Sequence, residues 1–142
     1  LAKHAIDPHL IVLEITERTL VKESDVDNDV LAELAALGVG LVLDDFGTGF
    51  SSLSLLKSLP IDRIKIDRTF VQALPDDKHS RELCRTIVSL ADSLGMAVTA
   101  EGIETQPQRQ FLQSLRCEEG QGYLFSHPLS EPHMTSMLAP QR

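Results

Sequence analysis

Residues 41–53 read LVLDDFGTGFSSL, an apolar run that ends in two adjacent acids and continues into a glycine-rich loop. Two like charges repel each other, and the end of a buried strand offers little water to either carboxylate. Asp44 and Asp45 therefore need a physical reason to lie side by side here. One reason is a cation held between the two carboxylates. The alternative is that an acid caps the helix that follows the turn.

Short apolar stretches alternate with helical patterns along the whole chain. We predict strands at residues 11–16, 39–45, 63–67 and 96–101, and a weak fifth strand at 119–122. We predict helices at residues 26–37, 51–58, 80–94, 107–115 and 132–138. Ser24 or Asp25 can cap the first helix, and Gly38 and Gly95 occupy helix C-cap positions. Repeated alternation of this kind indicates an α/β fold whose parallel strands are joined by right-handed crossovers.

Polar residues lie at or near the carboxyl ends of the predicted strands. They are Glu14, Asp44 and Asp45, Lys65, Glu101 and Gln121. Because parallel strands end at the same edge of a sheet, we expect four carboxylates, a lysine and an amide to converge there. In parallel α/β folds this edge is where ligands bind and chemistry occurs. A lysine that points into a barrel needs an anion, so a structural salt bridge to Asp44 or Glu14 is the alternative to a catalytic role for Lys65.

Composition excludes several classes of function. A chain of 142 residues with a formal net charge of -8 has the size of one domain and lacks the basic surface that duplex nucleic acid requires. Cys84 and Cys117 are too few and too far apart for a disulfide framework, and we expect two reduced thiols in a cytoplasmic protein. No apolar run has the length of a membrane span, so any membrane anchor would belong to domains outside this chain.

The glycine-rich loop permits two further interpretations. Gly47 and Gly49 begin a dinucleotide-binding fingerprint, but Ser52 occupies the position of its third glycine. A phosphate cradle at the start of the helix near Ser51 is one possibility. The other is a glycine turn that leaves Asp44 and Asp45 facing a site.

Five ordered segments identify a family resemblance. They are EITE (residues 14–17), DDFGTGFSSL (44–53), KID (65–67), AEGIET (100–105) and QGY (121–123). In this order and spacing they resemble the EAL-domain family, bacterial phosphodiesterases that hydrolyse cyclic di-GMP to linear pGpG. The resemblance implies a modified (β/α)₈, TIM-like barrel with two divalent metal ions, Mg²⁺ or Mn²⁺, above the strand ends. About five of the eight βα units are present.

The resemblance also implies what this chain lacks. The family's signature Glu-Ala-Leu strand, whose glutamate binds the first metal, is absent, and so is an asparagine ligand from another early strand. Both would precede Leu1. We therefore expect residues 1–142 to be the C-terminal part of a single EAL-type domain, with the N-terminal strands absent from this chain. Such a barrel cannot close as a monomer, and the isolated chain is expected to be inactive.

The metal ligands that the resemblance implies are all carboxylates. Glu14 and Asp44 match ligands of the first metal, and Asp44 bridges to the second. Asp45 matches a ligand of the second metal. Glu101 matches a carboxylate that lies near the second metal and near Lys65. Hard oxygen ligands favour Mg²⁺ or Mn²⁺ over zinc. Two such ions reverse the local field, which would otherwise repel a phosphodiester, and lower the pKa of bound water.

Three further residues receive roles from the resemblance. Lys65 matches the lysine that orients or deprotonates the attacking water, and with Glu101 it forms the expected catalytic pair. Gln121 matches a glutamine near the metal and the substrate. Glu17 resembles the glutamate that steadies the loop after Asp45, a loop also implicated in dimerisation.

The expected partners are cyclic di-GMP and a second copy of the chain, as a homodimer or a strand-exchanged oligomer. The alternative function is a non-catalytic EAL module that binds cyclic di-GMP or another protein. A third class, a metal-free interaction fragment, predicts that Mg²⁺ and Mn²⁺ leave thermal stability unchanged.

Overall fold

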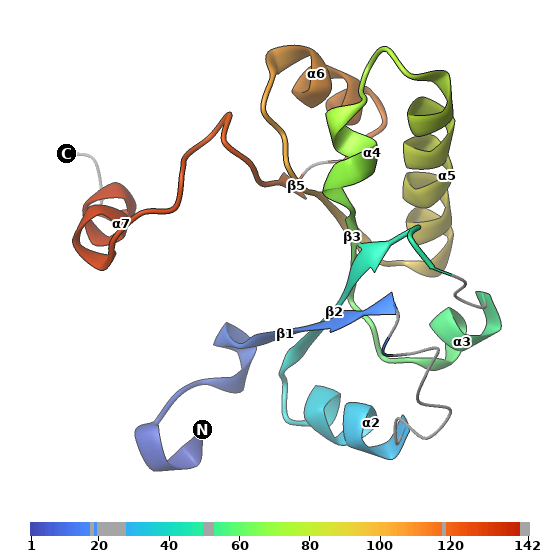
Figure 1. Ribbon diagram of the computed structural model, residues 1–142. Coiled ribbons are helices and arrows are strands. Elements are labelled where there is room, and N and C mark those ends of the chain that lie inside the picture. Colours follow the sequence, from blue (N-terminus) through green and yellow to red (C-terminus); the bar gives the residue numbers. More distant parts are fainter. Residues whose placement is uncertain (18, 20–27, 50–52, 118, 140–142) are drawn as a thin grey trace.

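A single sheet of five parallel strands forms the centre of the molecule (Figure 1). The computed structural model describes residues 1–17, 19, 28–49, 53–117 and 119–139. The strands are β1 (Val12–Thr16), β2 (Gly40–Phe46), β3 (Arg63–Ile66), β4 (Ala97–Ala100) and β5 (Glu119–Gly120). They lie side by side in chain order, and every neighbouring pair is parallel. The predicted parallel α/β fold is confirmed, and β5 is the shortest strand, as its weak sequence pattern indicated.

Helices connect the strands. They are α2 (Asn28–Ala36), α3 (Leu53–Ser58), α4 (Arg68–Gln72), α5 (Lys78–Leu94) and α6 (Gln106–Ser114). The 3₁₀ turns η1 (Ala2–His4) and η2 (Pro8–Leu10) precede β1, and α7 (Glu131–Leu138) follows β5. Gly95 ends α5 in the left-handed conformation, with φ 71°, as predicted. The predicted caps Ser24 and Asp25 lie outside the described residues.

Helix α4 was not predicted, because five residues are too few to show a helical period. It begins where the Asp67 side chain accepts a hydrogen bond from the Thr69 amide at 2.9 Å, which satisfies a free N–H of the first turn. Side-chain capping therefore defines this helix, and it places α4 directly after β3.

The hydrophobic core lies between the sheet and its helices. Strand residues Leu41, Leu43, Ile64 and Ile66 are fully buried and pack in one cluster with residues of α3, α4, α5 and α6. Side chains alternate along a strand, so the residues between them face the other side of the sheet. Lys65, between Ile64 and Ile66, is therefore directed to the face opposite the core.

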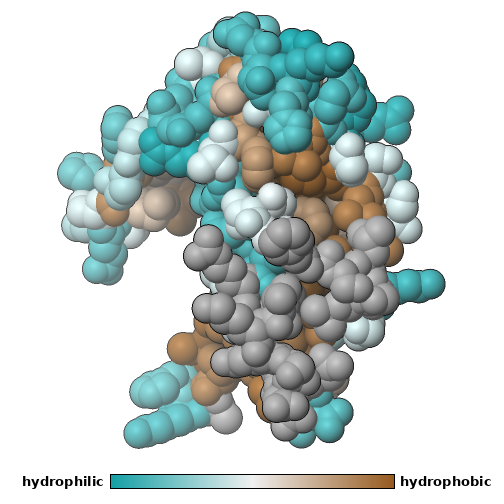
Figure 2. Space-filling view, turned by 45° about the vertical axis from the view of Figure 1, so that its right-hand side comes forward, coloured by the Kyte–Doolittle hydropathy of each residue, from teal (hydrophilic) through white to brown (hydrophobic). Residues whose placement is uncertain are grey.

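The described sheet is open, with β1 and β5 as its edges. Val12 and Leu13 of β1 are 56% and 39% exposed. Helix α7 projects from the far edge on an extended segment (Figure 1), and the molecule is hollowed on this side (Figure 2). Met134, Met137 and Leu138 of α7 are also exposed. Within the described residues, no helix is both long enough and apolar enough to cross a membrane.

We expect the isolated chain to self-associate, because an unpaired apolar edge strand pairs with another chain. Replacing Val12 with Lys should weaken the association by placing a charge on the β1 edge. Light scattering at micromolar concentration measures the effect, and Val30→Lys on α2, whose side chain is also exposed, is the matched control. A monomer at this concentration, or an equal effect of both substitutions, would contradict the expectation.

Candidate functional site

Lys65 lies at the centre of a carboxylate cluster at the carboxyl ends of the strands. Its Nζ atom is 2.6 Å from Glu101 Oε1, 2.8 Å from Glu14 Oε1 and 3.2 Å from Asp44 Oδ1. The three acids belong to β1, to β2 and to the residue after β4, so the ammonium links four strands. An ammonium carries three donors, and each has a carboxylate partner here. The structure therefore contains both salt bridges named as alternatives from the sequence, and a third to Glu101.

These carboxylates determine the charge of Lys65. The side chain is only 8% exposed, and burial disfavours the charged ammonium. Hydrogen bonds to Glu101, Glu14 and Asp44, together with the negative charge of Glu101, outweigh this effect and raise the pKa of Lys65 above its usual range. In this arrangement, without a bound metal ion, the lysine is therefore charged at physiological pH and donates hydrogen bonds to the carboxylates.

Asp44 and Asp45 reach the same site through an irregularity in β2. Strict alternation would direct adjacent side chains to opposite faces. The ladder with β3 pairs Leu43 with Ile64 but Phe46 with Ile66, so β2 contains one extra residue there. Asp45 adopts φ 55°, a left-handed conformation that Asp tolerates. Its amide donates to Asp44 Oδ1 at 3.0 Å.

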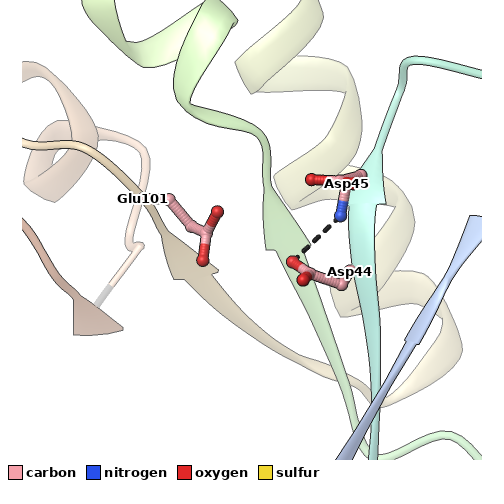
Figure 3. A group of neighbouring side chains, drawn as sticks. All are labelled: Asp44, Asp45 and Glu101. Atoms are coloured by element: carbon pink, nitrogen blue, oxygen red, sulfur yellow. Dashed lines mark hydrogen bonds between the residues drawn. The ribbon is translucent and has the colours of Figure 1, made fainter.

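Asp44, Asp45 and Glu101 each offer a carboxylate oxygen within 4.8 Å of the others (Figure 3). Oxygen donors at this spacing, without His or Cys, fit a hard divalent cation such as Mg²⁺ or Mn²⁺. Burial, followed by the negative charges of Asp44 and Asp67, raises the pKa of Asp45. A cation between these groups would remove that cost, which is a reason for two acids to follow one another in the sequence.

Gln121 completes the group at the far edge of the sheet. Its Nε2 atom donates to Glu101 Oε1 at 2.7 Å. The backbone amide of Gln121 donates to the Ala100 carbonyl at 2.9 Å, and its carbonyl accepts from the Ile103 amide at 3.0 Å. The residue after β5 is therefore tied to the end of β4 by both main chain and side chain.

Comparisons with known proteins place these residues in a family. The model of the EAL domain matches residues 1–128. The chain belongs to the EAL domain family. It is 39% identical over 139 residues to the bifunctional diguanylate cyclase/cyclic di-GMP phosphodiesterase MucR of Pseudomonas aeruginosa, covering 98% of this chain and 20% of MucR. It is 45% identical over 117 residues to the cyclic di-GMP phosphodiesterase NbdA of the same species, covering 82% of this chain and 15% of NbdA.

Solved EAL structures share the fold. The PaMucR phosphodiesterase in complex with c-di-GMP has a TM-score of 0.90 at 40% identity, with 94% of this chain and 54% of that chain covered. BlrP1 of Klebsiella pneumoniae, in a complex with manganese and cyclic di-GMP, has a TM-score of 0.82 at 34% identity, with 90% and 33% covered. The chain thus spans about half of the MucR structure and a fifth of the curated MucR sequence.

Glu17 holds the EAL-domain loop that follows Asp45. The residue is 2% exposed, and its Oε2 atom accepts from the amides of Gly47 at 3.1 Å and Gly49 at 3.0 Å. A side chain at Gly49 would bring its Cβ to 2.9 Å from the Glu17 carboxylate carbon, so a larger residue would push the carboxylate away from the loop amides. The possible phosphate cradle near Ser51 and Ser52 lies outside the described residues.

Asp67 is an acidic residue of the site region to which sequence reasoning assigned no role. It caps α4, and after burial and the charge of Asp44 it contributes to the raised pKa of Asp45. The sequence signal was available, because Asp67 directly follows β3 as Glu101 follows β4. Position after a strand does not by itself distinguish a helix cap from a site residue.

A cavity of about 570 Å³ extends from Glu101 and Gln121 toward α7. Arg68 contributes a positive charge to its lining, and Tyr123 and Phe125 contribute aromatic surface. The cluster therefore borders a space that accepts a molecule larger than water, with a charged side and an apolar side.

We expect Asp45→Asn to stabilise the metal-free chain by about 2–4 °C in Tm at neutral pH, because it removes a repelled charge and keeps the left-handed preference. The raised pKa means that the fold favours protonated Asp45. The gain should therefore be largest above this pKa and shrink as pH falls through it. Thermal melts in chelator across pH 4–8 measure this, with Asp76→Asn in an exposed turn as control. A lower Tm for Asp45→Asn at neutral pH would contradict this expectation.

Proposed function

We propose that residues 1–142 are the C-terminal part of an EAL-type phosphodiesterase domain, and that this domain in the parent protein hydrolyses cyclic di-GMP to linear pGpG. The observation that carries the proposal is the meeting of Glu14, Asp44 and Glu101 on Lys65 at the carboxyl ends of the strands. Relatives named as cyclic di-GMP phosphodiesterases support the substrate.

In this proposal the open sheet is part of a (β/α)₈ barrel. The chain covers 54% of the PaMucR structure at a TM-score of 0.90, which leaves nearly half of that chain for the remaining units. The two edges of the described sheet are the places where added strands would pair. A second copy of the chain would cover the same edges, so a homodimer or strand-exchanged oligomer is the state we propose for the isolated piece.

Glu14, Asp44, Asp45 and Glu101 are the proposed ligands of two divalent cations. Four carboxylates around one ammonium leave a net negative charge, which would repel a phosphodiester. Bound Mg²⁺ or Mn²⁺ supplies the positive charge and polarises the phosphodiester and water as a Lewis acid. The manganese and calcium complexes of BlrP1 support a divalent ion in this fold, and they do not distinguish Mg²⁺ from Mn²⁺.

Lys65 and Glu101 are the proposed catalytic residues. With its ammonium charged, Lys65 donates a hydrogen bond that orients the attacking water. Glu101, 2.6 Å from the ammonium, is the neighbouring group that can accept the proton. Gln121 donates to Glu101 and thereby fixes the direction of its free lone pairs.

Glu17 supports catalysis indirectly by holding the loop after Asp45. Two amides of this loop bind one buried carboxylate oxygen, so the backbone leaving β2 has a fixed course. Cys84 and Cys117 are both buried and free, which suits the reducing cytoplasm that we propose for this domain.

Hydrolysis of cyclic di-GMP by the purified parent protein, with Mn²⁺ and with linear pGpG as the measured product, tests the proposed function. The isolated 142-residue chain should be inactive under the same conditions. Activity of the parent would exclude the alternative, a non-catalytic module. Binding of cyclic di-GMP without any pGpG would establish that alternative and overturn the proposal.

Asp44→Asn and Lys65→Ala should separate metal binding from chemistry in the parent. Asp44→Asn keeps the side-chain shape and removes a ligand charge, so Mn²⁺ binding and turnover should fall together. Lys65→Ala removes no ligand, so Mn²⁺ should still bind while the chemical step slows by about 10²–10⁴-fold.

Calorimetric Mn²⁺ titration beside single-turnover hydrolysis measures both effects, and Lys57→Ala on an exposed position of α3 is the lysine control. If Lys65→Ala abolished Mn²⁺ binding as fully as Asp44→Asn, Lys65 would be only a structural counter-ion and its proposed role would be wrong.

A further inference from the structure

A second polar cluster lies directly beneath the carboxylate site, on the same face of the sheet. Arg63 of β3 donates from Nη1 to Thr99 Oγ1 of β4 at 2.8 Å, and it forms an ion pair with Glu119 of β5. Thr99 Oγ1 in turn donates to Glu119 Oε2 at 3.4 Å. Three side chains from three adjacent strands therefore form a closed triangle.

Each member of the triangle lies two residues before a residue of the site. Arg63 precedes Lys65, Thr99 precedes Glu101, and Glu119 precedes Gln121. Because side chains two apart in a strand share a face, the triangle forms the layer below the Lys65–Glu101–Gln121 chain of hydrogen bonds. The two layers link β3, β4 and the β5 edge in parallel.

Strand β5 needs such a link. It consists of two residues and pairs with β4 through Thr99–Glu119 and Ala100–Gly120 only. Gly120 offers no side chain for packing. The position of Gln121 thus depends on this short ladder and on its two backbone hydrogen bonds with Ala100 and Ile103, all at an open edge, where local opening costs least.

We propose that Arg63 is a positioning residue that, through Thr99 and Glu119, holds β5 in register and keeps the Gln121 amide on Glu101. We call the contacts among Arg63, Thr99 and Glu119 the clamp. The importance of the Gln121–Glu101 contact for catalysis rests on the proposed function, whereas the clamp does not depend on it. Nη1 of the guanidinium meets both the Thr99 hydroxyl and the Glu119 carboxylate, because this one nitrogen carries two N–H donors and a share of the positive charge, which an uncharged apolar side chain lacks.

Local hydrogen exchange of the 142-residue chain tests the clamp. The reporters are the backbone amides of Gln121 and Ile103, whose hydrogen bonds join the β5 edge to β4. Arg63→Met and Glu119→Gln should each accelerate their exchange by about three- to tenfold and leave the amides of α5 unchanged. The charge-reversed pair, Arg63→Glu with Glu119→Arg, should restore the exchange rates to within about twofold.

The side-chain amide of Gln121 provides a second measurement, and a substitution on α5 provides a matched control. The side-chain amide resonances of Gln121 should shift toward free-amide values in both single variants, because the contact with Glu101 loosens. Arg85→Met removes the exposed Arg85–Glu82 ion pair of 2.8 Å on α5 and should change neither reporter.

The clamp would be overturned by unchanged Gln121 resonances and exchange rates in both single variants. It would also be overturned by equal acceleration of every amide, which indicates a loss of global stability only. No metal, cyclic nucleotide or turnover enters the experiment, so its result is independent of whether the parent hydrolyses cyclic di-GMP.

Discussion

Mutual repulsion among acids at the strand ends is the constraint around which this structure is arranged. Parallel strands in register bring their carboxyl ends together, and here the ends of β1, β2, β3 and β4 all carry carboxylates. The buried ammonium of Lys65 offsets part of this charge by pairing with three of them. Asp45 is not paired with Lys65 in this way, and burial, followed by the negative charges of Asp44 and Asp67, raises its pKa. Binding of a further cation would therefore reduce the repulsion among these carboxylates.

The local backbone is adapted to this arrangement. The bulge in β2 turns Asp45 toward Asp44 and Glu101, although adjacent residues of a regular strand face apart. Glu17 then fixes the glycine loop that follows. The bulge places Asp45 in a less favoured backbone conformation, and Glu17 buries a carboxylate. The first positions an acid of the site, and the second holds the loop beside it. Strain concentrated in this way is typical of functional sites.

Much of this could be predicted from the sequence, because polar residues that end apolar strands must meet at one edge of a parallel sheet. The strands and the meeting of Glu14, Asp44, Lys65 and Glu101 depend on alternation and parallel pairing alone. Asp45 was also expected at the site, and it lies there, but alternation alone would place it on the wrong face, and the bulge in β2 that turns it toward Asp44 was not predicted. Helix α4 was missed because capping, not periodicity, defines it.

Side-chain contacts between neighbouring strands could not be predicted from the sequence either. The triangle of Arg63, Thr99 and Glu119 depends on which strands are neighbours and on their register, and neither is encoded by any local pattern. The role of Asp67 was ambiguous for a different reason. A carboxylate after a strand can cap a helix or face a site, and this one caps α4 while it also approaches Asp45.

The central claim is that the carboxylates around Lys65 form a divalent cation site. Paramagnetic broadening by Mn²⁺, followed in the amide spectrum of the 142-residue chain, tests it most directly because it detects even weak binding. Substoichiometric Mn²⁺ should broaden residues 44, 45, 101 and 121 first, and Asp44→Asn should abolish this selectivity. Broadening spread over the acidic surface, or unchanged by Asp44→Asn, would contradict the claim.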